Sequence, residues 1–346
     1  MAGMTAKQTA ANPATTAGDR ARRARPVAII AVGVAVLLAL GWLSLMYGAL
    51  TLSPAEAWRG LTSESDVFTR NVVWQIRYPR WLDAMLVGAS LAVAGALLQG
   101  VTRNPLADPT ILGVTAAAGL ASSAAIVIAA DIPQWGIAMA CAAGGLGGAA
   151  VLFVIAYRGA ISPVRLALAG VALSAFFGAG IVALLSSSRI FLQANLGFLA
   201  GGLYGSGWTD FRAAVPYVVT GLVAAMLVSG RLNILALGDD IATSLGVLTD
   251  RTRVAILAIC GILTAAVVSI AGLVSFVGLV CPHIARYTVG SDNRVVIPVS
   301  ALYGAILVTA ADLAAKVVLS PTEIPMGIIT AAIGAPFLLY LVKSRP

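Results

Sequence analysis

Hydrophobic residues form long runs along this chain, and short polar segments separate the runs. A run of about 20 apolar residues is long enough to cross a bilayer as a helix. The pattern therefore predicts an all-α polytopic membrane protein with ten transmembrane helices, the eighth of which is short and contains Pro282. The predicted spans are residues 27–50, 81–101, 110–130, 135–157, 164–187, 211–230, 254–273, 276–289, 296–318 and 326–343.

Small residues recur every four positions along the second span, at Ala84, Gly88, Ala92, Ala96 and Gly100. One small-residue face lets helix backbones approach closely in a membrane. Tight packing inside one subunit is the expected use of this face, and a dimer seam is the alternative.

An internal repeat divides the spans into two weakly related halves of five helices. The Ala-Gly pair at 94–95 precedes Pro105 by ten residues, as the pair at 271–272 precedes Pro282. Such repeats are common in transporters. Chance coincidence in a chain rich in alanine and glycine is the alternative.

Composition agrees with residence in lipid, because 60% of the residues are hydrophobic and only 10% are charged. Soluble domains carry about 25% charged residues. The net charge of +8 is interpreted as membrane topology, not nucleic-acid binding, because basic residues prefer cytoplasmic loops. With both termini cytoplasmic, fifteen of the 22 basic residues lie inside and seven outside.

The first 26 residues are polar and end in an arginine cluster, which predicts a disordered basic cytoplasmic tail. A signal peptide is the competing interpretation, but the apolar run at 27–50 is too long for a signal core. Residues 27–346 then form the ten-helix transmembrane domain. Cys141, Cys260 and Cys281 lie in apolar context and are expected to be buried free thiols.

Four of the seven outer basic residues gather in one loop before the second span: Arg59, Arg70, Arg77 and Arg80. Topology disfavours positive charge at this position, so the cluster needs another explanation.

Enzymatic motifs are scarce, which argues against a membrane enzyme. His283 is the only histidine, and none of the three lysines follows a glycine, so the chain has no P-loop. Any ATP hydrolysis must come from a separate subunit. Asp83 and Asp312 keep an ion-coupled secondary transporter open as an alternative, although Lys316 is placed to neutralise Asp312 at i,i+4.

Three polar segments interrupt the apolar pattern. Residues 103–109 form a turn made rigid by two prolines, and residues 323–327 form a turn before the last span. The cytoplasmic loop 231–253 predicts a short amphipathic helix between Gly238 and Gly246, a docking surface for a cytosolic partner.

Short motifs follow one another in a fixed order between residues 27 and 343. They are Ile76–Arg80, Gly88–Ala89, Ala94–Gly95, Arg103–Pro109, Leu112–Val114, Leu232–Leu235, Leu237–Gly238, Ser244–Gly246, Phe276–Val280, Pro282–Arg286, Gly290, Glu323–Gly327 and Gly334–Phe337. Together they resemble the FecCD-type permease of bacterial ABC importers for iron-siderophores, haem and cobalamin.

The resemblance implies partners for the chain and roles for particular residues. The partners are a second permease copy or a paralogue, two cytosolic ABC ATPase subunits, and a periplasmic or lipid-anchored substrate-binding protein. The implied ATPase-coupling residues are Gly238, Asp239, Asp240, Ile241, Ala242, Thr243, Ser244, Leu245 and Gly246. The implied cytoplasmic gate residues are Asn104, Pro105, Leu106, Ser162 and Pro163, where Pro163 departs from the family's small hydroxylated residues. The implied binding-protein contacts are Arg77, Arg80 and Lys316, the last usually an arginine in the family.

We therefore expect a multi-pass permease of the bacterial inner membrane, without catalytic, metal or cofactor sites of its own. It would move an iron complex in an ATP-driven importer, with ferric siderophore the first choice of substrate and haem or cobalamin the alternatives.

Overall fold

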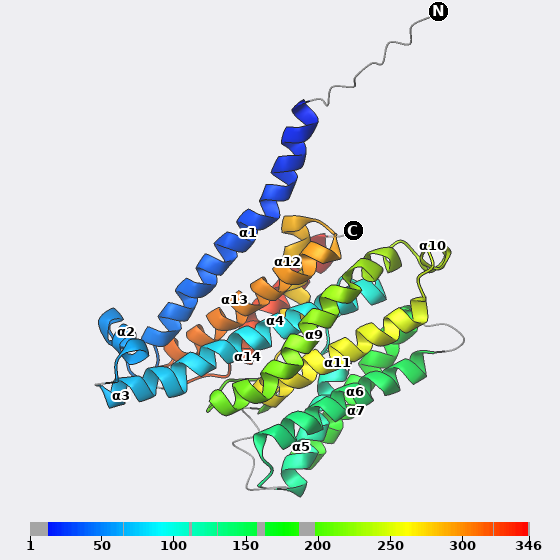
Figure 1. Cartoon of the computed structure of the whole chain (residues 1–346). Coiled ribbons are helices and arrows are strands. Elements are labelled where there is room, and N and C mark those ends of the chain that lie inside the picture. The colour runs from blue at the N-terminus through cyan, green and yellow to red at the C-terminus, as the bar shows by residue number, and fades with distance from the viewer. Residues whose placement is uncertain are drawn as a thin grey trace, which may run out of the picture.

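The computed structural model describes residues 13–64, 66–110, 113–129, 131–157, 163–186, 198–320 and 322–344. All regular elements in these ranges are helices, which run as a bundle with α2 and α3 at one end and α10 at the other (Figure 1). The helices are α1 (Pro13–Met46), α2 (Pro54–Thr62), α3 (Val67–Arg70), π-helical η1 (Asn71–Arg77), α4 (Tyr78–Thr102), α5 (Val114–Ile128), α6 (Gln134–Ala156), α7 (Pro163–Ser186), α9 (Trp208–Leu235), α10 (Asp239–Ser244), α11 (Thr249–Ala271), α12 (Val277–Val289), α13 (Asn293–Val317) and α14 (Met326–Ser344).

Each of the ten predicted spans coincides with a helix in this arrangement. Among the described residues, seven helical segments are long and apolar enough to cross a membrane, including the continuous helix from α3 through α4. Helices α5, α12 and α14 are shorter, and Pro282 lies inside α12 as predicted. The structure thus confirms an all-α, multi-pass architecture, while the count of ten crossings and the relation between the halves stay predictions.

Helix α1 differs from the expected tail-then-helix arrangement. It begins at Pro13, so residues 13–26 are helical where the sequence predicts a disordered tail. An alanine- and arginine-rich stretch has high helix propensity and can extend the apolar helix that follows it. The N-terminal half of α1 projects beyond the other helices, and its apolar half packs mainly on α13 (Figure 1).

Helix α4 is the centre of the bundle and packs against α13, α11, α9 and α12. Its small-residue face works inside the subunit, as predicted. A side chain on Gly88 would overlap the backbone of Gly304, and one on Gly95 would overlap Gly278. These glycines let α4 lie directly against α13 and α12.

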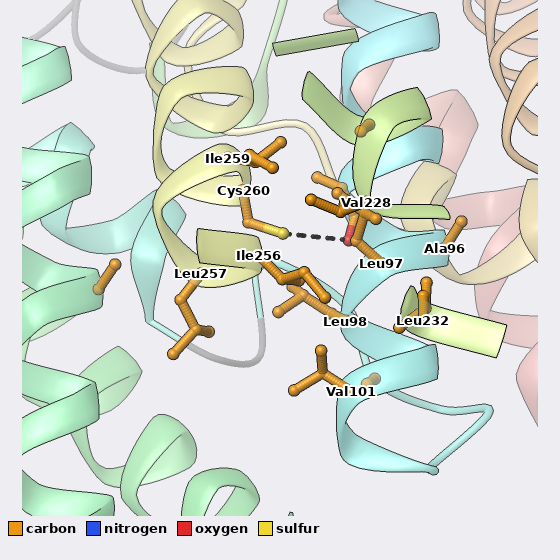
Figure 2. Packing of buried hydrophobic residues seen from close by; sticks show 14 of the residues in the cluster. Ala96, Leu97, Leu98, Val101, Val228, Leu232, Ile256, Leu257, Ile259 and Cys260 are labelled. Carbon is orange, nitrogen blue, oxygen red and sulfur yellow. Dashed lines mark hydrogen bonds between the residues drawn. The ribbon is translucent and has the colours of Figure 1, made fainter. Parts of the chain in front are cut away.

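The main hydrophobic core forms where α4, α9 and α11 meet. Figure 2 shows Leu97 and Leu98 of α4 among Val228 of α9 and Ile256 of α11. Cys260 is buried in this core, and its thiol lies 3.6 Å from the carbonyl of Ala94. All three cysteines are buried and free, as predicted.

An aromatic cluster marks the outer end of the bundle. The ring of Trp74 stacks on Tyr78, and the indole N–H of Trp208 donates to the Trp74 carbonyl at 2.8 Å. Tryptophan and tyrosine are enriched at membrane–water interfaces. The cluster therefore marks a membrane interface at the end of the bundle opposite α10.

Candidate functional site

Helix α10 is a short exposed helix that reverses the chain between α9 and α11. Gly238 precedes it with φ 117°, and Gly246 follows it with φ 79°. Side chains other than glycine rarely adopt these conformations, which explains why glycines bound the loop. The short helix predicted between these glycines is confirmed.

The two faces of α10 differ in polarity and exposure. Ala242 is fully buried against the bundle, whereas Ile241 is 49% exposed, and Leu245 and Leu248, which follow the helix, are 59% and 61% exposed. These three residues are called the apolar face of α10 below. Isolated exposed leucines are ordinary, but an apolar group on a polar loop marks an interaction surface. The structure thus presents the apolar face that the sequence predicts for a cytosolic partner.

Asp239, the first residue of α10, forms ion pairs with two helices of the bundle. Its carboxylate accepts hydrogen bonds from Arg253 of α11 at 2.8 and 3.0 Å, and it also contacts Arg103 after α4. Burial disfavours the charged form, but the hydrogen bonds and charges of Arg253 and Arg103 outweigh it and lower the pKa of Asp239. The carboxylate is therefore ionised throughout the physiological pH range.

The predicted gate turn after α4 is an ordered loop that packs on α12 and α14. Asn104 accepts a hydrogen bond from the Leu106 amide at 2.9 Å, and Asp108 accepts one from the Thr110 amide at 2.8 Å. Leu106 packs in a cluster with Leu279 of α12 and residues of α14. Ser162 lies outside the described residues, and Pro163 begins α7. The gating role of these residues stays a prediction.

Arg77, expected to face a partner, is 6% exposed and caps the end of α1. Its guanidinium donates to the carbonyls of Leu45 at 2.7 Å and Met46 at 2.9 Å, and to that of Leu50. The last carbonyls of a helix have no partner within the helix, so Arg77 satisfies groups that lipid could not.

Arg80 and Lys316 are likewise buried, in a cluster of ion pairs. Arg80 contacts Asp312 at 2.8 Å and Glu323 at 2.8 Å, and Lys316 contacts Asp312 at 2.6 Å. The i,i+4 pairing of Asp312 with Lys316 is confirmed. With Arg77 included, three cations face two carboxylates, and this outer charge cluster keeps one excess positive charge.

A pocket of about 200 Å³ leads to the outer charge cluster. Arg77, Arg80, Lys316 and Glu323 line it beside residues 47–50 of the loop after α1. The three predicted contact residues are therefore brought together, as a group beneath a pocket and not as projecting side chains.

Sequence reasoning missed the partners that connect distant helices. Asn233 at the end of α9 donates to Asp292 at 2.6 Å and accepts from the Asn293 side chain at 2.8 Å. Gln99 of α4 donates to the carbonyl of Gly278 at 3.1 Å and contacts Arg286 of α12. For Gln99 and Arg286 the available signal was a polar residue inside a predicted span, because such residues need partners in lipid. Asn233, Asp292 and Asn293 lie between predicted spans and gave no such signal.

His283 lies in α12, where its ring meets that of Phe337 edge to face, with centroids 5.6 Å apart. Within the described ranges, no group of three histidine, cysteine, aspartate or glutamate side chains could hold a metal ion.

Comparison with known proteins gives this arrangement its family. The FecCD transport family matches residues 36–344. The iron(3+)-hydroxamate import system permease protein FhuB of Bacillus subtilis is 38% identical over 323 residues, covering 92% of this chain and 84% of the relative. The Fe(3+) dicitrate transport system permease protein FecD of Escherichia coli is 38% identical, covering 90% and 98%. The cobalamin import system permease protein BtuC of Halobacterium salinarum is 43% identical, covering 79% and 74%.

A solved structure agrees with the sequence comparison. An inward-facing putative metal-chelate type ABC transporter superposes with a TM-score of 0.81 at 31% identity, covering 92% of this chain and 99% of that chain. The chain is a multi-pass protein of the cytoplasmic membrane, and it belongs to the FecCD transport family as a permease of the ABC importer type.

Proposed function

We propose that the chain is the membrane permease subunit of an ATP-driven importer that carries a ferric siderophore across the cytoplasmic membrane. The observation that carries the proposal is the exposed apolar face of α10 on a chain of this family. Such a face suits a groove on a cytosolic ATPase, which supplies the hydrolysis that this chain has no P-loop to perform. Iron is favoured because FhuB and FecD, which match most of the chain, are permeases for ferric complexes.

Cobalamin is the second candidate substrate, because the BtuC relative is 43% identical to this chain. Haem is a third candidate. Two permease copies and two ATPase subunits would form the transporter, with the loop at 103–109 and the start of α7 as cytoplasmic gates.

Uptake by reconstituted vesicles tests the energy source and the substrate together. The permease, its ATPase and its binding protein are placed in liposomes with radiolabelled ferric hydroxamate or cyanocobalamin. We expect the ferric complex to accumulate only with ATP. Uptake driven by an ion gradient through the purified chain alone would show a secondary transporter instead, and selective cobalamin uptake would reassign the substrate.

The outer charge cluster is our proposed contact for the binding protein. The pocket over Arg77, Arg80 and Lys316 has room for an acidic side chain, and one excess positive charge would attract it. Complementary charge accelerates and orients association.

Two substitutions with opposite expected effects test this contact. Glu323→Gln raises the excess positive charge from one to two, so the loaded binding protein should associate faster at low ionic strength. Lys316→Gln removes the excess and should slow association. Both effects should shrink in high salt, because salt screens the long-range attraction between the two proteins as they approach. Glu64→Gln, at an exposed position near Arg70, is the control. If Glu323→Gln slows association as Lys316→Gln does, the cluster only supports the fold.

A further inference from the structure

The carboxylate of Asp239 joins three segments of the chain, one of which lies 136 positions away in sequence. It starts α10, it binds Arg253 in the first turns of α11, and it binds Arg103 at the end of α4. Arg103 precedes α9 and α10 in the sequence, and Arg253 follows them. One side chain thus links the exposed loop to two helices of the bundle.

Breaking the ion pair between Asp239 and Arg253 is energetically unfavourable. Arg253 is 1% exposed and is among the largest fully buried side chains of the described residues. Asp239 approaches it at 2.8 Å, whereas Asp250 lies 3.9 Å away. Asp239 is thus the nearer of these two carboxylates, and moving it away from a buried guanidinium is unfavourable. Separation of α10 from the start of α11 therefore costs free energy.

The contact with Arg103 reaches the gate loop. Arg103 is the first residue after α4, and its backbone is left-handed with φ 50°, which is uncommon for a residue other than glycine. Its guanidinium also donates to the carbonyl of Leu235 at 2.8 and 3.1 Å. The residue that turns the chain into the gate loop is thus fixed to the end of α9 and to α10.

The gate loop continues this connection to α12. Leu106 packs with Leu279, and the side chain of Asp108 lies beside Gly278. A displacement of α10 would therefore pull on Arg103 directly and on α12 through only a few intervening residues.

We propose that Asp239 is a positioning residue that makes α10, the start of α11 and the gate loop move as one body. In this arrangement the apolar face of α10 receives the ATPase, and Asp239 passes the resulting displacement to the gate. The inference rests on the proposed function, because it assigns a direction to the force that the ATPase would apply.

Asp239→Asn provides the test, because it keeps the shape of the side chain and removes its charge. The measured quantity is substrate transported per ATP hydrolysed by the complete importer in vesicles. We expect this ratio to fall about tenfold or more, a size typical of coupling between sites. The ATPase should still co-purify, because the apolar face remains. Asp239→Glu should recover much of the ratio, since it restores the carboxylate.

Matched variants separate this role from a general effect of charge. Asp131→Asn removes an exposed carboxylate at the other end of the molecule and should leave the ratio unchanged. Arg103→Gln keeps the Asp239–Arg253 pair but frees the start of the gate loop from α10 and from the end of α9, so it should also lower the ratio. Arg231→Gln, at an exposed cytoplasmic position, is its control.

The possible outcomes are distinct. A wild-type ratio in Asp239→Asn overturns the inference. If that variant does not assemble, Arg103→Gln decides, and a wild-type ratio there overturns the inference equally. If the wild-type importer moves its substrate without ATP, the proposed function fails, and no ratio is then altered by either variant.

Discussion

Buried charged side chains at the outer end of this molecule are stabilised by ion pairs with one another. The carboxylate of Asp312 serves both Arg80 and Lys316, and Glu323 gives Arg80 a second partner. Neither cation could remain buried alone, because desolvation of an unpaired ion is very costly. The same residues can therefore be essential for the fold before any role in docking is considered.

Asp312→Asn should destabilise the protein by about 3–5 kcal/mol, because it leaves Arg80 and Lys316 with one carboxylate between them. Thermal unfolding of the protein in detergent measures the effect. Asp131→Asn, at an exposed position, should change the midpoint little. Equal midpoints for the two variants would show that water or Glu323 already neutralises the cations.

Contact between whole helices depends on residues that lack side chains. Helix α4 lies against α13 where Gly88 meets Gly304, and against α12 where Gly95 meets Gly278. In lipid, association rests on such close packing and not on burial from water. The spacing of small residues along α4 predicted this face, and the structure identifies the two helices that use it.

Gly88→Ala should separate α4 from α13, since the added methyl group would overlap the backbone at Gly304. Overpacking of this kind typically costs about 1–3 kcal/mol. Gly147→Ala is the matched control, because nothing lies within 4 Å of a side chain at that position. The midpoint of thermal unfolding should fall for Gly88→Ala only, since alanine favours a helix more than glycine does and should not destabilise α6 at position 147. A similar fall in both variants would contradict close packing as the reason.

The periodicity of the sequence predicts where helices lie along the chain, but it does not predict which helices contact one another. Runs of apolar residues located the helices, and Gly238 and Gly246 bounded α10, because both signals are local. The Arg80–Asp312 pair spans 232 positions, and the Arg103–Asp239 pair spans 136. Local pattern says nothing about which helices face each other. For that reason Arg77 and Arg80, expected at the surface, could not be predicted to lie buried.

The whole molecule has an outer end and a cytoplasmic end of different character. The aromatic cluster and the outer charge cluster lie at the end of the bundle where Figure 1 shows α2 and α3, and α10 lies at the other end. The excess of basic residues in the cytoplasmic segments sets this orientation. ABC importers receive substrate from a binding protein on the outer side of the membrane and energy from an ATPase on the cytoplasmic side, so the two ends serve different partners.

Labelling with a membrane-impermeant maleimide tests the orientation. The native cysteines are buried and should not react. In intact spheroplasts, Glu64→Cys should be labelled and Thr243→Cys should not, whereas both should react after permeabilisation. Both positions are exposed, so accessibility to water does not distinguish them. Labelling of Thr243→Cys in intact spheroplasts would reverse the assigned topology.

The cap that Arg77 places on α1 bears on biosynthesis. Helix α1 is synthesised before the segment that contains Arg77, and its last carbonyls await donors that lie about 30 residues further along the chain. Lipid offers no donor in the meantime. As soon as the segment containing Arg77 is inserted, α1 and α4 can close into a hairpin, before any later helix exists. The earliest stable unit of the nascent permease would then be this hairpin, onto which α13 packs only near the end of translation.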